Sequence, residues 1–282
     1  MSKALCGKKE KEDIKNIVNH IKNRTPQGLK IINNFRETFQ LDIKDAKLAG
    51  GRGKHFDLEI LVQDNSNGNE IWKTVEHKGT QKYVPIPENC KPWVNGVQFY
   101  NGGANKFSIG RKYAVKWYEK LIYTGYITFT YFIESPIPTL EEWLKQDAFR
   151  QGDPKTNFGA ELKRTYREYY GENSSLLEDR ERFVQKFEIN NDDLEILKKE
   201  VFDIAYKVLN EKDYWLQIYG DVNGNFNCKW SPKFLITQIS HINFKKKKDI
   251  IFQFICNDNL SFNGILRWGK GAGFSNIRLD LK

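Results

Sequence analysis

Phe56-Asp57-Leu58-Glu59-Ile60 and Thr74-Val75-Glu76-His77-Lys78-Gly79 are the two segments that decide the fold of this chain. Along the runs around both segments, apolar side chains largely recur at every second residue, and a period of two is the pattern of a β-strand. Between them lies a turn cluster, Asp64-Asn65-Ser66-Asn67-Gly68-Asn69, in which Asn-Gly is a strong hairpin signal. The sequence therefore predicts an antiparallel hairpin across these residues.

The length of the hairpin loop determines which residues face one another. A two-residue loop places Asp57 opposite Lys78, whereas a four-residue loop places Asp57 opposite Glu76. Directly paired residues of an antiparallel ladder share a face. In either register we therefore expect four charged side chains on one face, namely Asp57, Glu59, Glu76 and Lys78. A slip of one residue would separate them.

Three carboxylates and one lysine on one patch indicate metal-assisted phosphate chemistry. The carboxylates repel one another, so the cluster costs stability at neutral pH unless a cation or a proton compensates the charge. Mg²⁺ suits such oxygen ligands, because it accepts one or two carboxylates and keeps several waters for substrate phosphates. A lysine next to a bound water can orient it or stabilise charge on an attacked phosphate. These groups together favour phosphodiester hydrolysis.

The spacing of these residues resembles a known motif. Asp57, followed after eighteen residues by Glu76-x-Lys78, resembles the D…(D/E)xK pattern of the PD-(D/E)xK nuclease superfamily, which has the restriction-endonuclease-like fold. The resemblance implies that Asp57 and Glu76 bind the metal and that Lys78 assists the attacking water. Phe56 replaces the proline of the motif, which is not a catalytic group.

Further site residues are expected close to the motif. The resemblance implies a glutamate from a helix before the first core strand, and Glu37 is the candidate. Glu59 is the alternative third carboxylate, and the choice between the two stays open. His55 shares the parity of Asp57 and could contact a phosphate or a water of the site. His77 should point to the opposite face, as a packing residue.

The patterns along the chain, together with the resemblance, predict a mixed α/β fold with a central mixed sheet flanked by helices. Helical spacing of apolar residues occupies 9–22 and 26–39, and a helix at 111–123 precedes a buried strand at 126–133. A helix at about 191–209 is followed by mostly strand-like sequence, which predicts a β-rich C-terminal part.

Near residue 175 the pattern of predicted helices and strands changes, and this change predicts a domain boundary there. We expect a catalytic core with N-terminal helices at 1–174 and a C-terminal region at 175–282. That region could recognise DNA, form a dimer, or extend the same sheet as part of one domain.

The composition favours a polyanionic partner. The 282 residues include 45 Lys and Arg against 36 Asp and Glu, which gives a net charge of +9. Basic side chains neutralise phosphates and release counterions, and the 14% of aromatic residues includes rings that can stack on bases. We expect double-stranded DNA as the partner, with the choice of DNA implied by the resemblance.

Candidates for DNA contacts lie in three segments. A glycine-rich basic approach at 49–55 supplies Arg52 and Lys54, and an expected polar turn at 98–103 supplies Gln98. A second glycine-rich segment at 267–274 supplies Arg267 and Lys270. An ordinary loop is the alternative for 98–103, and a flexible hairpin tip is the alternative for 267–274.

The cysteines and the N-terminal sequence indicate the cellular compartment of the protein. The four cysteines are far apart and form no CxxC pair, which favours reduced thiols over a zinc site or a disulfide framework. We find no apolar signal region and no uncharged apolar run of membrane-spanning length. We therefore expect a soluble cytoplasmic protein without a membrane partner.

The expected function is a Mg²⁺-dependent endonuclease acting on double-stranded DNA, with Mn²⁺ able to substitute. We expect a sequence-specific type II restriction enzyme of a restriction-modification system that works as a homodimer. The alternatives are a structure-selective repair, recombination or viral nuclease and, from another class, a DNA-binding module without catalysis.

Overall fold

The computed structural model describes residues 3–49, 55–64, 68–80, 82–86, 97–103, 107–108, 191–245, 249–257, 260–268 and 276–281, with single positions between 111 and 161. The chain divides into two compact units, each built from two segments. Unit 1 comprises residues 1–94 and 206–235, and unit 2 comprises residues 95–205 and 236–282. The expected helix at 111–123 and strand at 126–133 lie almost wholly outside the described residues.

Two helices open unit 1, and both follow the predicted pattern. Helix α1 (Lys3–Lys22) buries the apolar stripe that the helical spacing selects, formed by Ile14, Ile17, Val18 and Ile21. Helix α2 (Pro26–Phe39) begins as predicted at Thr25, whose hydroxyl accepts a hydrogen bond from the Gly28 N–H at 3.2 Å.

The sheet of unit 1 has five strands in the order β1-β2-β3-β5-β6. Strands β1 (Leu41–Leu48), β2 (Leu58–Asp64) and β3 (Glu70–Thr80) form an antiparallel meander. Strand β5 (Tyr214–Gly220) pairs with β3 in parallel, and β6 (Phe226–Pro232) pairs with β5 in antiparallel orientation. The sheet is therefore mixed, and its last two strands come from the C-terminal half of the chain.

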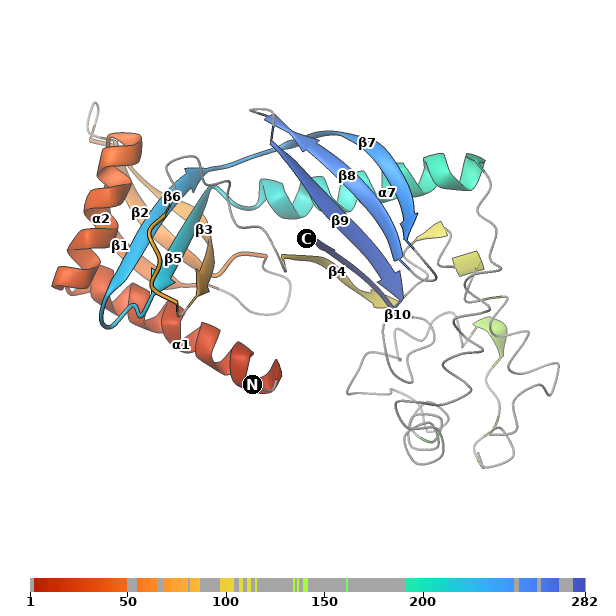
Figure 1. The fold of residues 1–282 in the computed structure, drawn as a ribbon, viewed down its shortest axis with the longest axis horizontal. Helices are drawn as coiled ribbons and strands as arrows, with labels where there is room; N and C mark the ends of the chain where they lie inside the picture. The colour runs from red at the N-terminus through yellow and green to blue at the C-terminus, as the bar shows by residue number, and fades with distance from the viewer. Residues whose placement is uncertain are drawn as a thin grey trace. The chain divides into compact units, whose positions relative to one another are not determined.

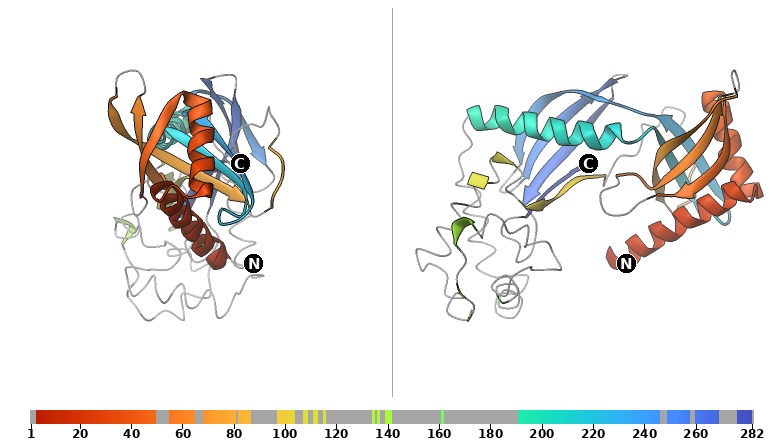
Figure 2. Two further views of the ribbon diagram at one scale, coloured as in Figure 1. Left: turned by 90° about the vertical axis from the view of Figure 1, so that its left-hand side faces the viewer. Right: turned by 180° about the vertical axis from the view of Figure 1, so that it is seen from behind.

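The two faces of this sheet differ in chemistry. Helices α1 and α2 cover one face (Figures 1 and 2), and the core lies between them and the apolar side chains of alternate strand positions, such as Leu58, Val75 and Leu216. The intervening positions, which include Glu59, Glu76 and Lys78, belong to the opposite face. The predicted hairpin thus has one core face and one charged face.

Unit 2 contains a second sheet, which is antiparallel throughout. It comprises β4 (Gln98–Gly103), β7 (Ile236–Lys245), β8 (Asp249–Cys256), β9 (Ser261–Trp268) and β10 (Asn276–Leu281), in the order β4-β10-β9-β8-β7. Helix α7 (Asn191–Asn210) precedes β5 in the chain, and the division between the units falls within it. The mixed α/β fold and the β-rich C-terminal part agree with the sequence prediction.

The structure divides the chain differently from the predicted boundary near residue 175. Strands β5 and β6 complete the sheet of unit 1, because the parallel pairing of β3 with β5 joins segments far apart in the sequence. No helix in the described part of the chain is long and apolar enough to cross a membrane.

Candidate functional site

The register of the β2–β3 hairpin brings the motif residues together. Leu58 pairs with Val75, and Asp57, in a bend directly before β2, donates its N–H to the Val75 carbonyl at 2.9 Å. This is the register of the four-residue loop, in which the Gly68 N–H donates to the Asp64 carbonyl at 2.8 Å. Gly68 has a φ of 73°, in the left-handed region that glycine adopts without strain. One of the two predicted registers is therefore observed.

Glu76 lies at the centre of the site and is held by two lysines. Its Oε1 is 2.8 Å from the Lys78 Nζ, and its Oε2 contacts the Lys212 Nζ. The side chain is buried, which by itself would raise the pKa of Glu76, but the two ammonium groups hold that pKa below its usual value. Glu76 is thus an ionised carboxylate with a cation on each oxygen.

Asp57 has a different environment, although it lies beside Glu76. Its Oδ2 accepts a hydrogen bond from the His77 N–H at 2.8 Å. Burial and the neighbouring charge of Glu76 raise the pKa of Asp57 to about 6. Asp57 forms no ion pair with any residue that the structure describes. Its negative charge is therefore poorly compensated.

Lys78 lies on the same face, and its side chain is largely buried. Burial would lower the pKa of Lys78, but the carboxylate of Glu76 raises it above its usual value. Glu10 of α1 also approaches, with its Oε1 4.0 Å from the Lys78 Nζ. Lys78 is therefore a fixed cation at neutral pH and not a proton acceptor.

Neither of the two predicted third carboxylates joins Asp57 and Glu76. Glu59 lies on the charged face, but it pairs with Lys47 of β1 at 2.8 Å. Glu37 is exposed on α2, where it lines a hollow with Cys228 of β6, two strands away from β3. Among the described residues no group of three or more His, Cys, Asp or Glu side chains could hold a metal ion. The three-carboxylate cluster is therefore corrected to a pair.

The two histidines near the motif do not join the site. His55 is partly buried and makes no hydrogen bond or ion pair with another residue in the described ranges. His77 is buried, as predicted for a packing residue, and burial lowers its pKa to about 4. Among the described residues, the helix glutamate that approaches Lys78 is Glu10 of α1, which lies outside the motif.

The candidate DNA contacts fall into two groups. Arg52, Lys54 and Lys270 lie outside the described residues. Gln98 is the first residue of β4, so the prediction of a polar turn at 98–103 is wrong, because this segment pairs with β10 as a strand. Arg267 lies in β9 opposite Asp249 and Arg278. Neither strand belongs to the unit that carries Asp57 and Glu76.

Two residues of the β5 segment are additions to the site. Lys212 precedes β5, and Gln217 pairs in register with Lys78. Gln217 is fully buried, and its Oε1 has no hydrogen-bond partner among the residues described. The position of Gln217 in a strand-like run indicates which face of that strand it occupies. The sequence does not show that this strand pairs with β3.

The side chains present fit a divalent cation of the Mg²⁺ type. Mg²⁺ needs only one or two protein carboxylates, with the remaining ligands coming from water and phosphate. Asp57 supplies a carboxylate with little cationic compensation next to the second carboxylate of Glu76. A divalent cation shared by the two would offset the repulsion that raises the pKa of Asp57.

Comparison of the chain with protein-family models and with curated proteins gave no match.

Proposed function

We propose that this protein is a Mg²⁺-dependent endonuclease that hydrolyses phosphodiester bonds of double-stranded DNA, with a site of the PD-(D/E)xK type. The observation that supports this most is the proximity of Asp57 to Glu76 and Lys78, since the Asp57 carboxylate accepts from the N–H of the residue between them and its pKa responds to both of their charges. The net charge of +9 also favours a polyanionic substrate.

The side chains have distinct roles in this proposal. Asp57 and Glu76 hold Mg²⁺, which when bound supplies Lewis-acid polarisation of a phosphate oxygen and lowers the pKa of a water. Lys78 stays protonated beside Glu76, so it donates hydrogen bonds to the attacking water and to the phosphate. In-line attack of the water on phosphorus breaks the P–O3′ bond and leaves a 5′-phosphate.

We further propose a sequence-specific enzyme of the type II restriction class that acts as a homodimer, one protomer for each strand. The chain is long, and unit 2 adds a whole antiparallel sheet beyond the sheet that carries the site. Such an additional unit gives room for base recognition, which the β2–β3 hairpin does not provide.

Plasmid cleavage tests the proposal. We expect discrete fragments with Mg²⁺ or Mn²⁺ and none with EDTA. Lys78→Met should reduce the rate by at least about 100-fold, since general acid–base and charge-stabilising groups commonly contribute that much. Lys73→Met is the matched control, because Lys73 is on the same strand and its nearest acidic partner is Asp213 at 3.8 Å.

The outcomes separate the candidate functions. A smear or cutting only at junctions and flaps would favour a structure-selective nuclease. The pairing of both Glu76 oxygens with lysines is the observation that favours a DNA-binding module without catalysis. DNA retention in a gel shift, with no cutting under any divalent cation, would support that second candidate and refute the nuclease.

A further inference from the structure

Lys212 is a buried lysine that contacts Glu76 from a distant part of the sequence. It lies in the short connection between α7 and β5, and only 1% of its surface is exposed. Its Nζ contacts the Oε2 of Glu76, whereas Lys78 contacts the other oxygen, Oε1. At this depth the ammonium group cannot reach a DNA backbone, so any function it has must act through Glu76.

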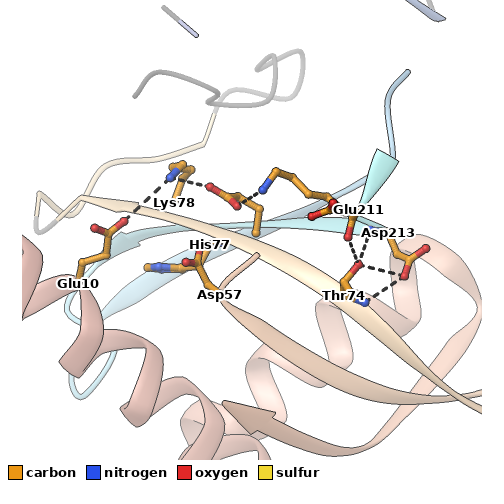
Figure 3. A network of polar contacts seen from close by, with 9 residues as sticks. Glu10, Asp57, Thr74, His77, Lys78, Glu211 and Asp213 are labelled. Carbon is orange, nitrogen blue, oxygen red and sulfur yellow. Dashed lines mark hydrogen bonds and ion pairs between the residues drawn. The ribbon is translucent and has the colours of Figure 1, made fainter. Parts of the chain in front are cut away.

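The segment around Lys212 is held on both sides by Thr74 of β3. The Thr74 hydroxyl donates to the Glu211 carbonyl at 2.6 Å and accepts from the Asp213 N–H at 3.0 Å. The Thr74 N–H in turn donates to the Asp213 Oδ2 at 3.0 Å (Figure 3). Both chain neighbours of Lys212 are thus bonded to a residue two positions before Glu76.

We propose that Lys212 is a positioning residue of the active site, which fixes the carboxylate of Glu76 for the divalent cation. This inference rests on the proposed function. A carboxylate has about four lone-pair sites, and the two lysines occupy one site on each oxygen. The remaining lone-pair sites of Glu76 then point in fixed directions, as is required for a cation that both Asp57 and Glu76 bind.

The alternatives give different results for removal of the ammonium group. A lysine that only competes with the metal for Glu76 would, once removed, leave a site that binds the cation more tightly. A lysine that only stabilises the fold would lower the unfolding temperature without changing the cation affinity of the folded chain. Removal of a lysine that positions Glu76 would weaken the binding of the cation to the folded chain.

Titration of Mn²⁺ into the metal-free full chain, followed by calorimetry, distinguishes these cases. We expect Lys212→Met to weaken Mn²⁺ binding by about 10- to 100-fold, the usual cost of losing a group that orients a metal ligand. Lys233→Met is the matched control, since the Lys233 Nζ binds the Asn210 carbonyl at the end of α7 at 2.9 Å. Equal or tighter Mn²⁺ binding by Lys212→Met would overturn the inference.

A second pair of variants covers the case in which Lys212→Met does not fold. Thr74→Val removes the hydroxyl that binds the Glu211 carbonyl and the Asp213 N–H but keeps the backbone bonds between Thr74 and Asp213, whereas Thr74→Ser keeps the hydroxyl as well. We expect Thr74→Val to bind Mn²⁺ more weakly than Thr74→Ser, and equal affinities would refute the positioning of Lys212. A wild-type chain that binds no Mn²⁺ would overturn the proposed function as well, whereas wild-type binding retained by the variants overturns only this inference.

Discussion

Asp57→Asn should make the metal-free protein more stable at pH 8. Burial and the charge of Glu76 raise the pKa of Asp57 from an ordinary value of 3.8 to about 6. A difference of roughly two in pKa corresponds to about 3 kcal/mol, which is the cost of keeping this carboxylate ionised in the folded state. Asparagine removes the charge and retains an oxygen that can accept from the His77 N–H. We therefore expect a gain of up to about 3 kcal/mol in unfolding free energy.

The gain should depend on pH with a definite sign. Below pH 3.8 the carboxyl is protonated in both the folded and the unfolded states, so its titration contributes no difference. Between pH 3.8 and about 6 the folded state retains the proton that the unfolded state has lost, and wild-type stability falls relative to the variant. Above about pH 6 the full penalty is present, so the difference should level off.

Urea unfolding in EDTA at pH 4, 6 and 8, followed by tryptophan fluorescence, measures this difference. Asp203→Asn, at an exposed position of α7, is the control and should show no such pH-dependent gain. Added Mg²⁺ should stabilise the wild type by mass action and leave Asp57→Asn unchanged. A gain that is independent of pH, or a loss at pH 8, would refute the electrostatic account of Asp57.

Two further predictions concern the packing of unit 1. A Cβ at Gly28 would lie 1.9 Å from the carbonyl oxygen of His20, so Gly28→Ala must push α2 away from α1. We expect the free energy of unfolding, measured by thermal unfolding, to fall by at least about 2 kcal/mol. Burial lowers the pKa of His77 to about 4, so its imidazole should stay neutral at pH 5 in NMR titrations. A midpoint near 6.5 would show that His77 is solvated.

The charged face of the hairpin could be predicted because strand periodicity is a local property. Glu59, Glu76 and Lys78 share a face in any register that preserves parity, whereas the loop length and the bend that holds Asp57 before β2 had to be found from the structure. The first two helices could be predicted for the same reason, since the Thr25 cap and the spacing of Ile14 and Ile17 are local signals.

The rest of the site depends on pairings that the sequence does not encode locally. Lys212 reaches Glu76 only because β5 pairs in parallel with β3, across 136 residues of separation. Parity placed Glu59 on the charged face correctly, but it could not show that Lys47 on the far side of β2 would bind it. The helix glutamate was expected from the nearer helix, whereas α1 brings Glu10 to Lys78.

The long separation between Glu76 and Lys212 also orders the assembly of the site in time. Synthesis proceeds at about 5–20 residues per second, so roughly 7 to 27 seconds pass between the appearance of these two residues, which are 136 positions apart. During that interval a nascent chain contains Asp57, Glu76 and Lys78 but neither Lys212 nor the strand that follows it. The complete set of charges therefore exists only after Lys212 has been synthesised.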